Sequence, residues 1–197
     1  MIVLVRRLRR RRLARNNSGM AAVEFALLLP VLFTLLIGSF ETSNLLLAYL
    51  KLESAAETAA DLVAQTDVNT TLQSSDFTNI TNAVSKVMTP LSTTNLKIAY
   101  ASITFNTGSA AINWHVETNS AAPISLTSLP GGVTATTMGT AASGSTDSLV
   151  VVQLTYPNTS PLSSYFNTNY TLTEWAYNRP RYVSCVPTYQ NNGSVCP

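Results

Sequence analysis

The stretch "MAAVEFALLLPVLFTLLIGSF", residues 20–40, decides the fold of the N-terminal part of this 197-residue chain. It contains 21 residues, and Glu24 is its only charged side chain. As an α-helix it would be about 30 Å long, which matches the hydrocarbon core of a bilayer. We therefore predict a transmembrane helix over residues 20–40, in which Pro30 favours a kink.

A cleaved secretory signal peptide is the competing interpretation of this segment. The apolar run is longer than the usual hydrophobic region of a signal peptide, and no convincing A-x-A cleavage site follows it. The composition therefore favours a segment that stays in the membrane.

The charges of the chain are strongly segregated along the sequence. Seven of the twelve basic residues precede Gly19, in the run "RRLRRRRLAR" at residues 6–15, and from Met20 onward the formal net charge is −5. A basic run can bind nucleic acid, but this one adjoins an apolar segment and the chain has no second basic patch. We predict a topology signal and no nucleic-acid partner: the N-terminus stays cytoplasmic and the C-terminal part is exported.

The helical pattern continues beyond the apolar run. Apolar residues recur at spacings of three and four along one face of the following segment (Leu45, Tyr49, Leu52, Ala56, Ala59, Val63). Glu53, Glu57 and Asp61 line the opposite side, as in an amphipathic helix. We predict one helix from about Ala21 to Gln65.

The remaining segments predict a small α+β head. A helical pattern at residues 74–90 contains Phe77, Ile80, Val84 and Val87, begins at a capping Ser or Asp, and stops at Pro90. Strand patterns follow at residues 96–105, 110–117, 148–157 and 170–183; the third is the best candidate for a central strand, and Pro180 confines the last to an edge or ends it. A loop is expected at 120–147 and a short helical turn at 161–166.

The predicted fold class is therefore α+β: a long N-terminal helix, with a transmembrane half and an amphipathic half, packed on a small antiparallel sheet of three or four strands. The predicted domains are a basic leader at 1–19, a transmembrane helix at 20–40, an amphipathic extension at 41–66 and an α+β head at 67–197. The strand order is left open.

Catalytic residue combinations are missing from the sequence. The only histidine, His115, fits the outward position of a strand better than the role of a base, and Glu117, Asp147 and Glu174 cannot be paired from sequence. We predict a non-enzymatic protein with no catalytic residues, no metal site and no cofactor.

The two cysteines, Cys185 and Cys196, lie within the last thirteen residues. An exported head favours a disulfide between them, closed over ten intervening residues that include an Asn-Gly turn. Two free thiols in a loose tail are the alternative.

The wording "GMAAVEFALLLPVLFTLLIG", residues 19–38, resembles the TadE-like pseudopilins of tight-adherence (Tad, Flp-type) pilus systems. A basic leader ends in Gly19, and Glu24 is the fifth residue counted from Met20, as in type IV pilins. The stretch "NRPRYVSC", residues 178–185, is similar to the R-P-R ending common in that family.

The resemblance implies processing and assembly roles for these residues. A prepilin peptidase of the inner membrane would cut between Gly19 and Met20 on the cytoplasmic side. Glu24 would then pair with the new α-amine of Met20 in a neighbouring subunit and set the axial register, which offsets the cost of a carboxylate in lipid. The alternative is that Glu24 lies at the cytoplasmic interface and reaches the lipid headgroups.

The expected function is that of a membrane-anchored minor pilin or pseudopilin in assembly of a Tad-type pilus. Its partners would be the inner membrane, the prepilin peptidase, other pilin-like subunits and the Tad assembly platform, and its location a bacterial inner membrane with a single pass and a periplasmic head. An uncleaved bitopic envelope protein whose head binds a partner or surface is the alternative, and a signal-anchored exported enzyme is a third possibility.

Overall fold

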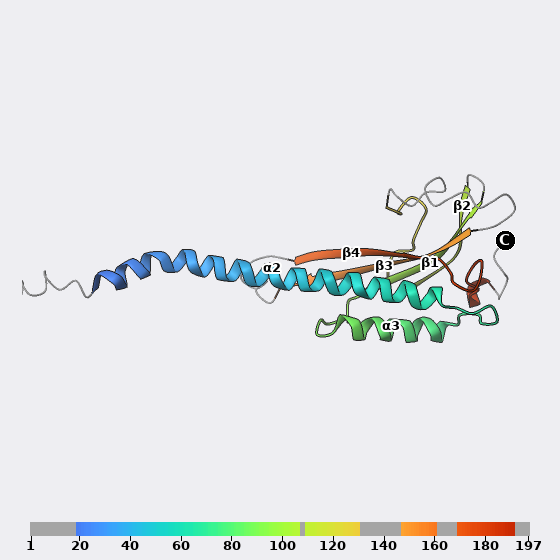
Figure 1. Cartoon of the computed structure of the whole chain (residues 1–197), viewed down its shortest axis with the longest axis horizontal. Helices are drawn as coiled ribbons and strands as arrows, with labels where there is room; N and C mark the ends of the chain where they lie inside the picture. The colour runs from blue at the N-terminus through green and yellow to red at the C-terminus, as the bar shows by residue number, and fades with distance from the viewer. Residues whose placement is uncertain (1–18, 107–108, 131–146, 161–168, 192–197) are drawn as a thin grey trace, which may run out of the picture. The chain divides into compact units, whose positions relative to one another are not determined.

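A computed structural model describes residues 19–106, 109–130, 147–160 and 169–191 of the chain (Figure 1). It divides into two compact units, residues 1–44 and 45–197. Helix α2, Met20–Ala64, contributes its first part to one unit and its second part to the other. The single long helix predicted from the sequence is thus confirmed, with both ends one residue earlier than expected.

The second unit contains a four-stranded antiparallel sheet. Its strands are β1 (Lys97–Asn106), β2 (Ser109–Thr118), β3 (Asp147–Thr159) and β4 (Asn169–Asn178), in the spatial order β2-β1-β3-β4. The prediction of a central position for the third strand is confirmed, and so is the edge position of the last strand, which ends before Pro180. The α+β class is also confirmed.

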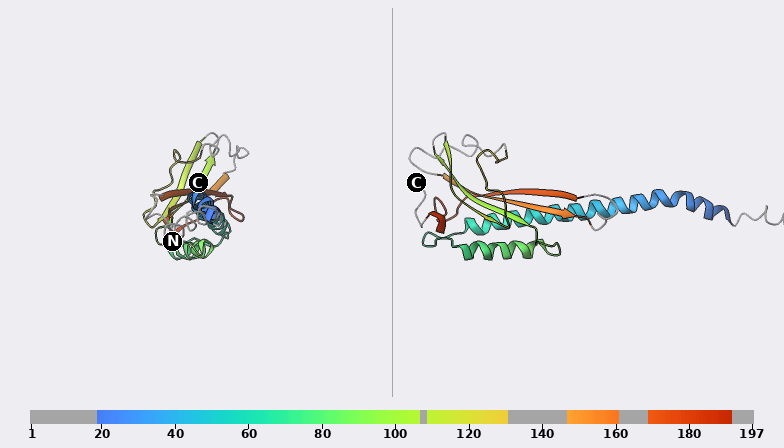
Figure 2. Two further views of the ribbon diagram at one scale, coloured as in Figure 1. Left: turned by 90° about the vertical axis from the view of Figure 1, so that its left-hand side faces the viewer. Right: turned by 180° about the vertical axis from the view of Figure 1, so that it is seen from behind.

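Helix α3, Ser74–Met88, lies beside the second half of α2 (Figures 1 and 2). Both helices contribute to one buried cluster with the even-numbered side chains of β1. The members from α2 are Ala48, Leu52, Ala55, Ala56, Ala59, Ala60 and Val63, and those from α3 are Phe77, Ile80, Val84 and Met88. Most of the α2 members are alanines, and such short side chains allow the helix backbone to approach its neighbours closely.

Phe77 stands at the centre of this core. Its ring centroid lies 5.2 Å from that of Tyr100 and 5.7 Å from that of Trp114, and the three side chains are at most 2% exposed. Tilted and edge-on ring pairs of this kind are favourable beyond their buried area. The aromatic cluster therefore joins α3 to the two strands β1 and β2.

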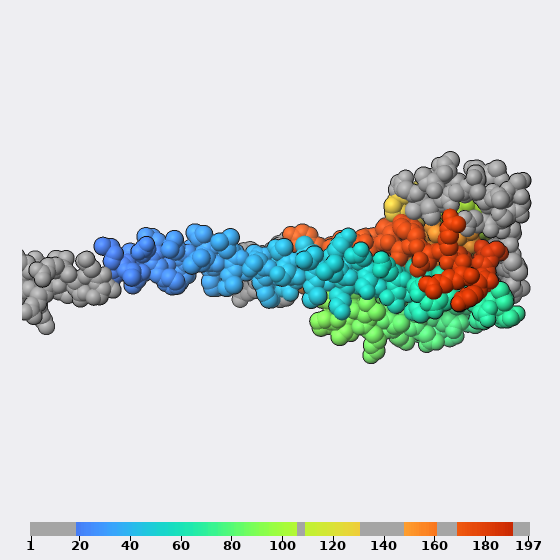
Figure 3. All heavy atoms as spheres, in the orientation of Figure 1, coloured from blue at the N-terminus to red at the C-terminus, as the bar shows by residue number. Residues whose placement is uncertain are grey.

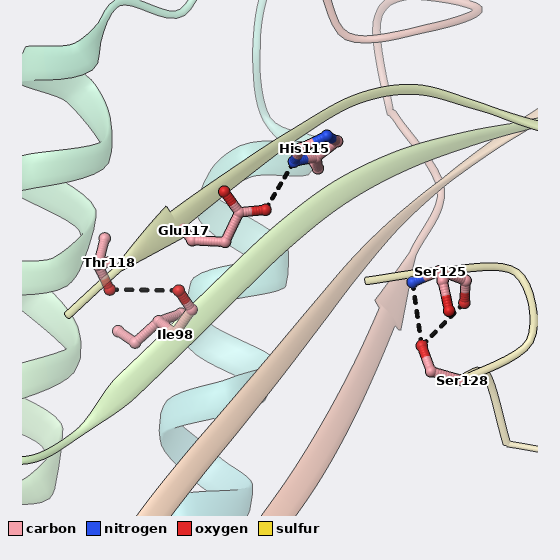
Figure 4. Close-up of polar contacts among 6 residues, drawn as sticks. All are labelled: Ile98, His115, Glu117, Thr118, Ser125 and Ser128. Atoms are coloured by element: carbon pink, nitrogen blue, oxygen red, sulfur yellow. Dashed lines mark hydrogen bonds and ion pairs between the residues drawn. The ribbon is translucent and has the colours of Figure 1, made fainter. Parts of the chain in front are cut away.

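The opposite face of the sheet carries a second, smaller cluster. Odd-numbered residues of β1 contact Leu149 and Val151 of β3 there. Ile124, in the connection between β2 and β3, packs against them and is 2% exposed. Ser125 and Ser128 close a turn next to Ile124, in which the Ser128 hydroxyl accepts from the Ser125 N–H at 3.0 Å (Figure 4). The predicted loop at 120–147 is thus turn-like up to residue 130, and its remainder to 146 lies outside the described residues.

A bulge in β2 reverses which side chains face the helices. The β1–β2 register shifts between Ser102 and Ile103, so that Asn113 has no pairing partner on β1. One inserted residue reverses the alternation of side chains between the two faces of the sheet. Ile112 packs on the second cluster, whereas Trp114 packs on the helix side. The simple alternation expected over 110–117 does not contain this reversal.

The segment after β4 closes the end of the core. The Arg181 N–H donates to the Ala64 carbonyl at 3.0 Å, and the Trp114 indole donates to the Val186 carbonyl at 2.7 Å. Leu72 forms a parallel bridge with Thr188 immediately before the short helix η2, Tyr189–Asn191. Figure 3 shows these C-terminal residues beside the end of α2.

Two local expectations from the sequence are wrong. Tyr49 was placed on the buried face of α2 but is 42% exposed, because its phenol reaches towards Glu174 on β4 instead of entering the core. The N-cap of α3 is Gln73, neither Ser nor Asp. The Gln73 N–H donates to the Asp76 carboxylate at 2.8 Å, which is one half of a capping box.

Candidate processing and assembly site

Gly19 directly precedes the first residue of α2, Met20. A Cβ atom added at Gly19 would meet nothing within 4 Å, so no packing within the described residues requires glycine here. Met20 is 67% exposed. The peptide bond between the two residues thus joins a sterically open glycine to the start of a helix.

Glu24 lies four residues into the same helix, on the face that also carries Met20, since positions i and i+4 are neighbours on a helix surface. Its side chain is exposed, and within the described residues it makes no hydrogen bond or ion pair. The structure therefore brings Gly19, Met20 and Glu24 together within the first turns of α2. The carboxylate is open to a group from outside the chain.

Exposed apolar side chains surround Glu24 along α2. Val23, Phe25 and Leu27 are 57% to 73% exposed, and the most apolar 18-residue window of the helix has a mean hydropathy of 2.4 with no burial inside the protein. By length and composition this is the one helix among the described residues that could cross a membrane. So wide an apolar surface requires a cover that the described residues do not supply.

The hydroxyl groups in this part of α2 are satisfied by the helix backbone. Thr34 donates to the Pro30 carbonyl at 2.8 Å, and Thr42 donates to the Gly38 carbonyl at 2.8 Å. Ser43 does the same to Ser39. In hydrocarbon, where water is absent, such internal bonds remove the cost of an unpaired hydroxyl.

His115 and Glu117 form an exposed pair on the edge strand β2. The His115 Nδ1 lies 2.6 Å from a carboxylate oxygen of Glu117, and Figure 4 shows both side chains on the same side of the strand. The expectation that His115 takes an outward strand position is confirmed. Within the described residues no group of three or more histidine, cysteine, aspartate or glutamate side chains could hold a metal ion.

Cys185 is 2% exposed, and its Sγ lies 3.3 Å from the Asn113 amide nitrogen and 3.7 Å from the Ser102 hydroxyl. It is therefore held at the bulge of β2. Cys196 lies outside the described residues, as do the side chain of Asp147 and the helical turn expected at 161–166. The disulfide between the two cysteines remains a prediction.

A polar contact between α2 and β4 was not predicted. Burial raises the pKa of the Glu174 carboxyl, the nearby Tyr49 hydroxyl lowers it, and the charge of Glu53 raises it again. The pKa of Tyr49 is raised in turn, mainly by the charges of Glu174 and Glu53. Three titratable side chains from two elements thus meet on one surface.

A second long-range contact links Arg181 to α2. Its guanidinium pairs with the Asp61 carboxylate, and its backbone N–H satisfies a carbonyl of the last helical turn. A cation near a helix C-terminus also interacts favourably with the helix dipole. The R-P-R stretch therefore binds the C-terminal end of α2 through Arg181, a contact that local periodicity does not predict.

Comparison with known proteins identifies the first of these regions. Residues 19–61 match the family model described as TadE-like protein. The match begins at Gly19 and runs through the membrane-type part of α2 into the part that packs on the sheet, so this segment is similar to TadE-like proteins, as the sequence resemblance predicted. No curated protein and no solved structure matches the chain.

Proposed function

We propose that the chain is a non-catalytic, membrane-anchored minor pilin or pseudopilin that acts in assembly of a Tad-type pilus. The main support for the proposal is that the TadE-like match and the long helix begin at neighbouring residues: the match starts at residue 19, and α2 starts at Met20. Cleavage between the two residues by a prepilin peptidase leaves a helix whose first residue bears the new α-amine.

The charges support the proposed orientation. The arginine-rich residues 6–15 stay on the cytoplasmic side of the inner membrane until cleavage, and the head enters the periplasm. Exposed apolar residues of α2 first contact lipid and then other pilin-like subunits, which cover the same surface during assembly. Glu24, exposed and without an intrachain partner among the described residues, pairs with the α-amine of a neighbouring subunit.

The proposed function is tested in cells that lack the chain. Electron microscopy should show Tad pili lost or sparse, restored by the wild-type chain and not restored by Gly19→Val. The open surroundings of Gly19 make this variant a test of processing rather than of folding. Normal pili in cells without the chain would reject a role in assembly and favour the uncleaved bitopic envelope protein.

A further inference from the structure

A groove of about 630 Å³ runs between the second half of α2 and the outer edge of β4. Its walls are Glu57, Thr58 and Asp61 from the helix, Trp175, Ala176, Tyr177 and Asn178 from the strand, and Arg181. The volume falls in the range of ligand clefts, ~300–1,000 Å³. All these residues belong to the unit of residues 45–197.

Among the described residues, no strand pairs with the outer edge of β4. β4 pairs with β3 over ten residues without a register shift, and within the described residues its other side has no backbone hydrogen bond. In an antiparallel strand, alternate residues direct their N–H and C=O groups to each side. A regular edge of this kind is a template for another chain.

The two edges of the sheet differ in this respect. β2, the other edge, has a bulge at Asn113 and carries the contacting side chains of His115 and Glu117, and both features discourage strand addition. β4 has no proline, lysine or bulge within Asn169–Asn178, and its only charge is Glu174. Natural sheets protect their exposed edges against pairing with other chains. An edge without such protection, next to a groove, therefore indicates a binding surface.

The charged side chains in and around the groove determine which kind of ligand it favours. Arg181 is engaged by Asp61, whereas Glu57 is exposed and has no ion-pair partner among the described residues. Glu53 lies one turn before Glu57 on α2, and Glu174 lies beside the groove on β4. The surface around the open edge therefore has excess negative charge and favours a basic side chain.

We propose that this groove binds an extended peptide segment that adds to the edge of β4 as a fifth strand and places a lysine or arginine side chain on Glu57. Main-chain hydrogen bonds supply the pairing, and the carboxylate supplies the preference for a basic side chain. The segment belongs to a partner protein, and the interaction is separate from the packing of the membrane helix.

The test uses the full chain in detergent micelles and a synthetic seven-residue peptide of alternating threonine and valine with a central arginine. Hydrogen exchange read by mass spectrometry should show that the peptide protects amides in residues 169–178. Two control peptides, one with a central glutamate and one N-methylated at alternate residues, should bind at least about fivefold more weakly. Equal binding of the N-methylated peptide, or no protection of β4, would overturn the proposal.

A matched pair of variants tests the role of Glu57. Glu57→Gln should weaken the binding of the arginine peptide about fivefold, which is the effect expected from the loss of one exposed charge pair. Glu117→Gln makes the same change on β2, at the opposite edge of the sheet and outside the lining of the groove, and should alter binding less than twofold. Equal effects of the two variants, or self-association of the chain through β4 that excludes the peptide, would contradict the assignment.

Discussion

The carboxylate of Glu174, on β4, faces the phenol of Tyr49, on α2, across 125 residues of sequence. Burial is the main cause that raises the pKa of Glu174 above its ordinary value of 4.5, and the charge of Glu53 adds to it. The contact joins α2 to the edge strand of the sheet, but it partly removes the Glu174 carboxylate from water, which is unfavourable for its charged form.

Replacing Glu174 should stabilise the head at neutral pH. Because the folded-state pKa lies above 4.5, the native state binds the proton more tightly than the unfolded state. Stability is therefore lost as the pH rises from 4.5 through the folded-state pKa. Glu174→Gln should raise the urea midpoint at pH 7 and raise it much less at pH 4, where the carboxyl is mostly protonated in both states of the wild type.

The measurement follows the combined fluorescence of Trp114 and Trp175 in the full chain during urea unfolding. Glu57→Gln, the same change at an exposed site of α2, is the control and should shift the midpoint little at either pH. A lower midpoint for Glu174→Gln at pH 7 would show that the charged carboxylate stabilises the head.

Phe77→Ala should destabilise the head by about 3–5 kcal/mol, because it removes the ring that contacts Tyr100 and Trp114 and leaves a cavity. Thr78→Ala, the exposed neighbour on α3, should change the free energy of unfolding by less than about 0.5 kcal/mol. Denaturant unfolding of both variants checks this prediction. A loss below about 1 kcal/mol for Phe77→Ala would mean that α3 is not anchored in the core.

The proposed disulfide between Cys185 and Cys196 should protect both thiols from alkylation. The mass of the denatured, unreduced chain should show no added label, and two labels should appear after reduction. Cys196→Ser should lower the free energy of unfolding by about 2–3 kcal/mol under oxidising conditions, the size expected for a bond that closes a short loop. In reductant the bond is absent from the wild type as well, so the variant should differ little from it. Two labels without reduction would favour the free thiols.

Glu24→Leu should leave cleavage after Gly19 intact and reduce assembly. The carboxylate lies beyond the scissile bond, and its proposed partner belongs to another subunit. Crosslinking of the chain to pilin-like subunits, compared with cleavage on the same gel, measures the two effects separately. Glu24→Asp, which keeps the charge, should assemble better than Glu24→Leu, and wild-type assembly of the leucine variant would reject the register role.

Local patterns were sufficient to predict the elements of this fold. The long helix follows from a continuous apolar run joined to a 3.6-residue period, and the strands at β1 and β2 were predicted within one residue at each end. The last strand was expected over 170–183, with Pro180 confining it to an edge or ending it, and β4 is an edge strand that ends earlier, at Asn178. These features depend on neighbouring residues, so they are visible without the tertiary structure.

The contacts between distant segments were not predictable in this way. Arg181 meets Asp61 across 120 residues, and Asn113 forms a bulge because β1 and β2 must direct Trp114 towards α3 and Ile112 away from it. Tyr49 fits the period of the buried face, yet its hydroxyl favours the polar contact with Glu174. In each case the partner, rather than the local pattern, decides where the side chain lies.

N-terminal sequencing of the chain from the membrane fraction tests the central claim most directly. The account predicts that the mature chain begins at Met20, and that Gly19→Val leaves a longer species that still carries the arginine-rich leader. A mature chain that begins at Met1 would contradict the assignment as a processed pilin-like subunit.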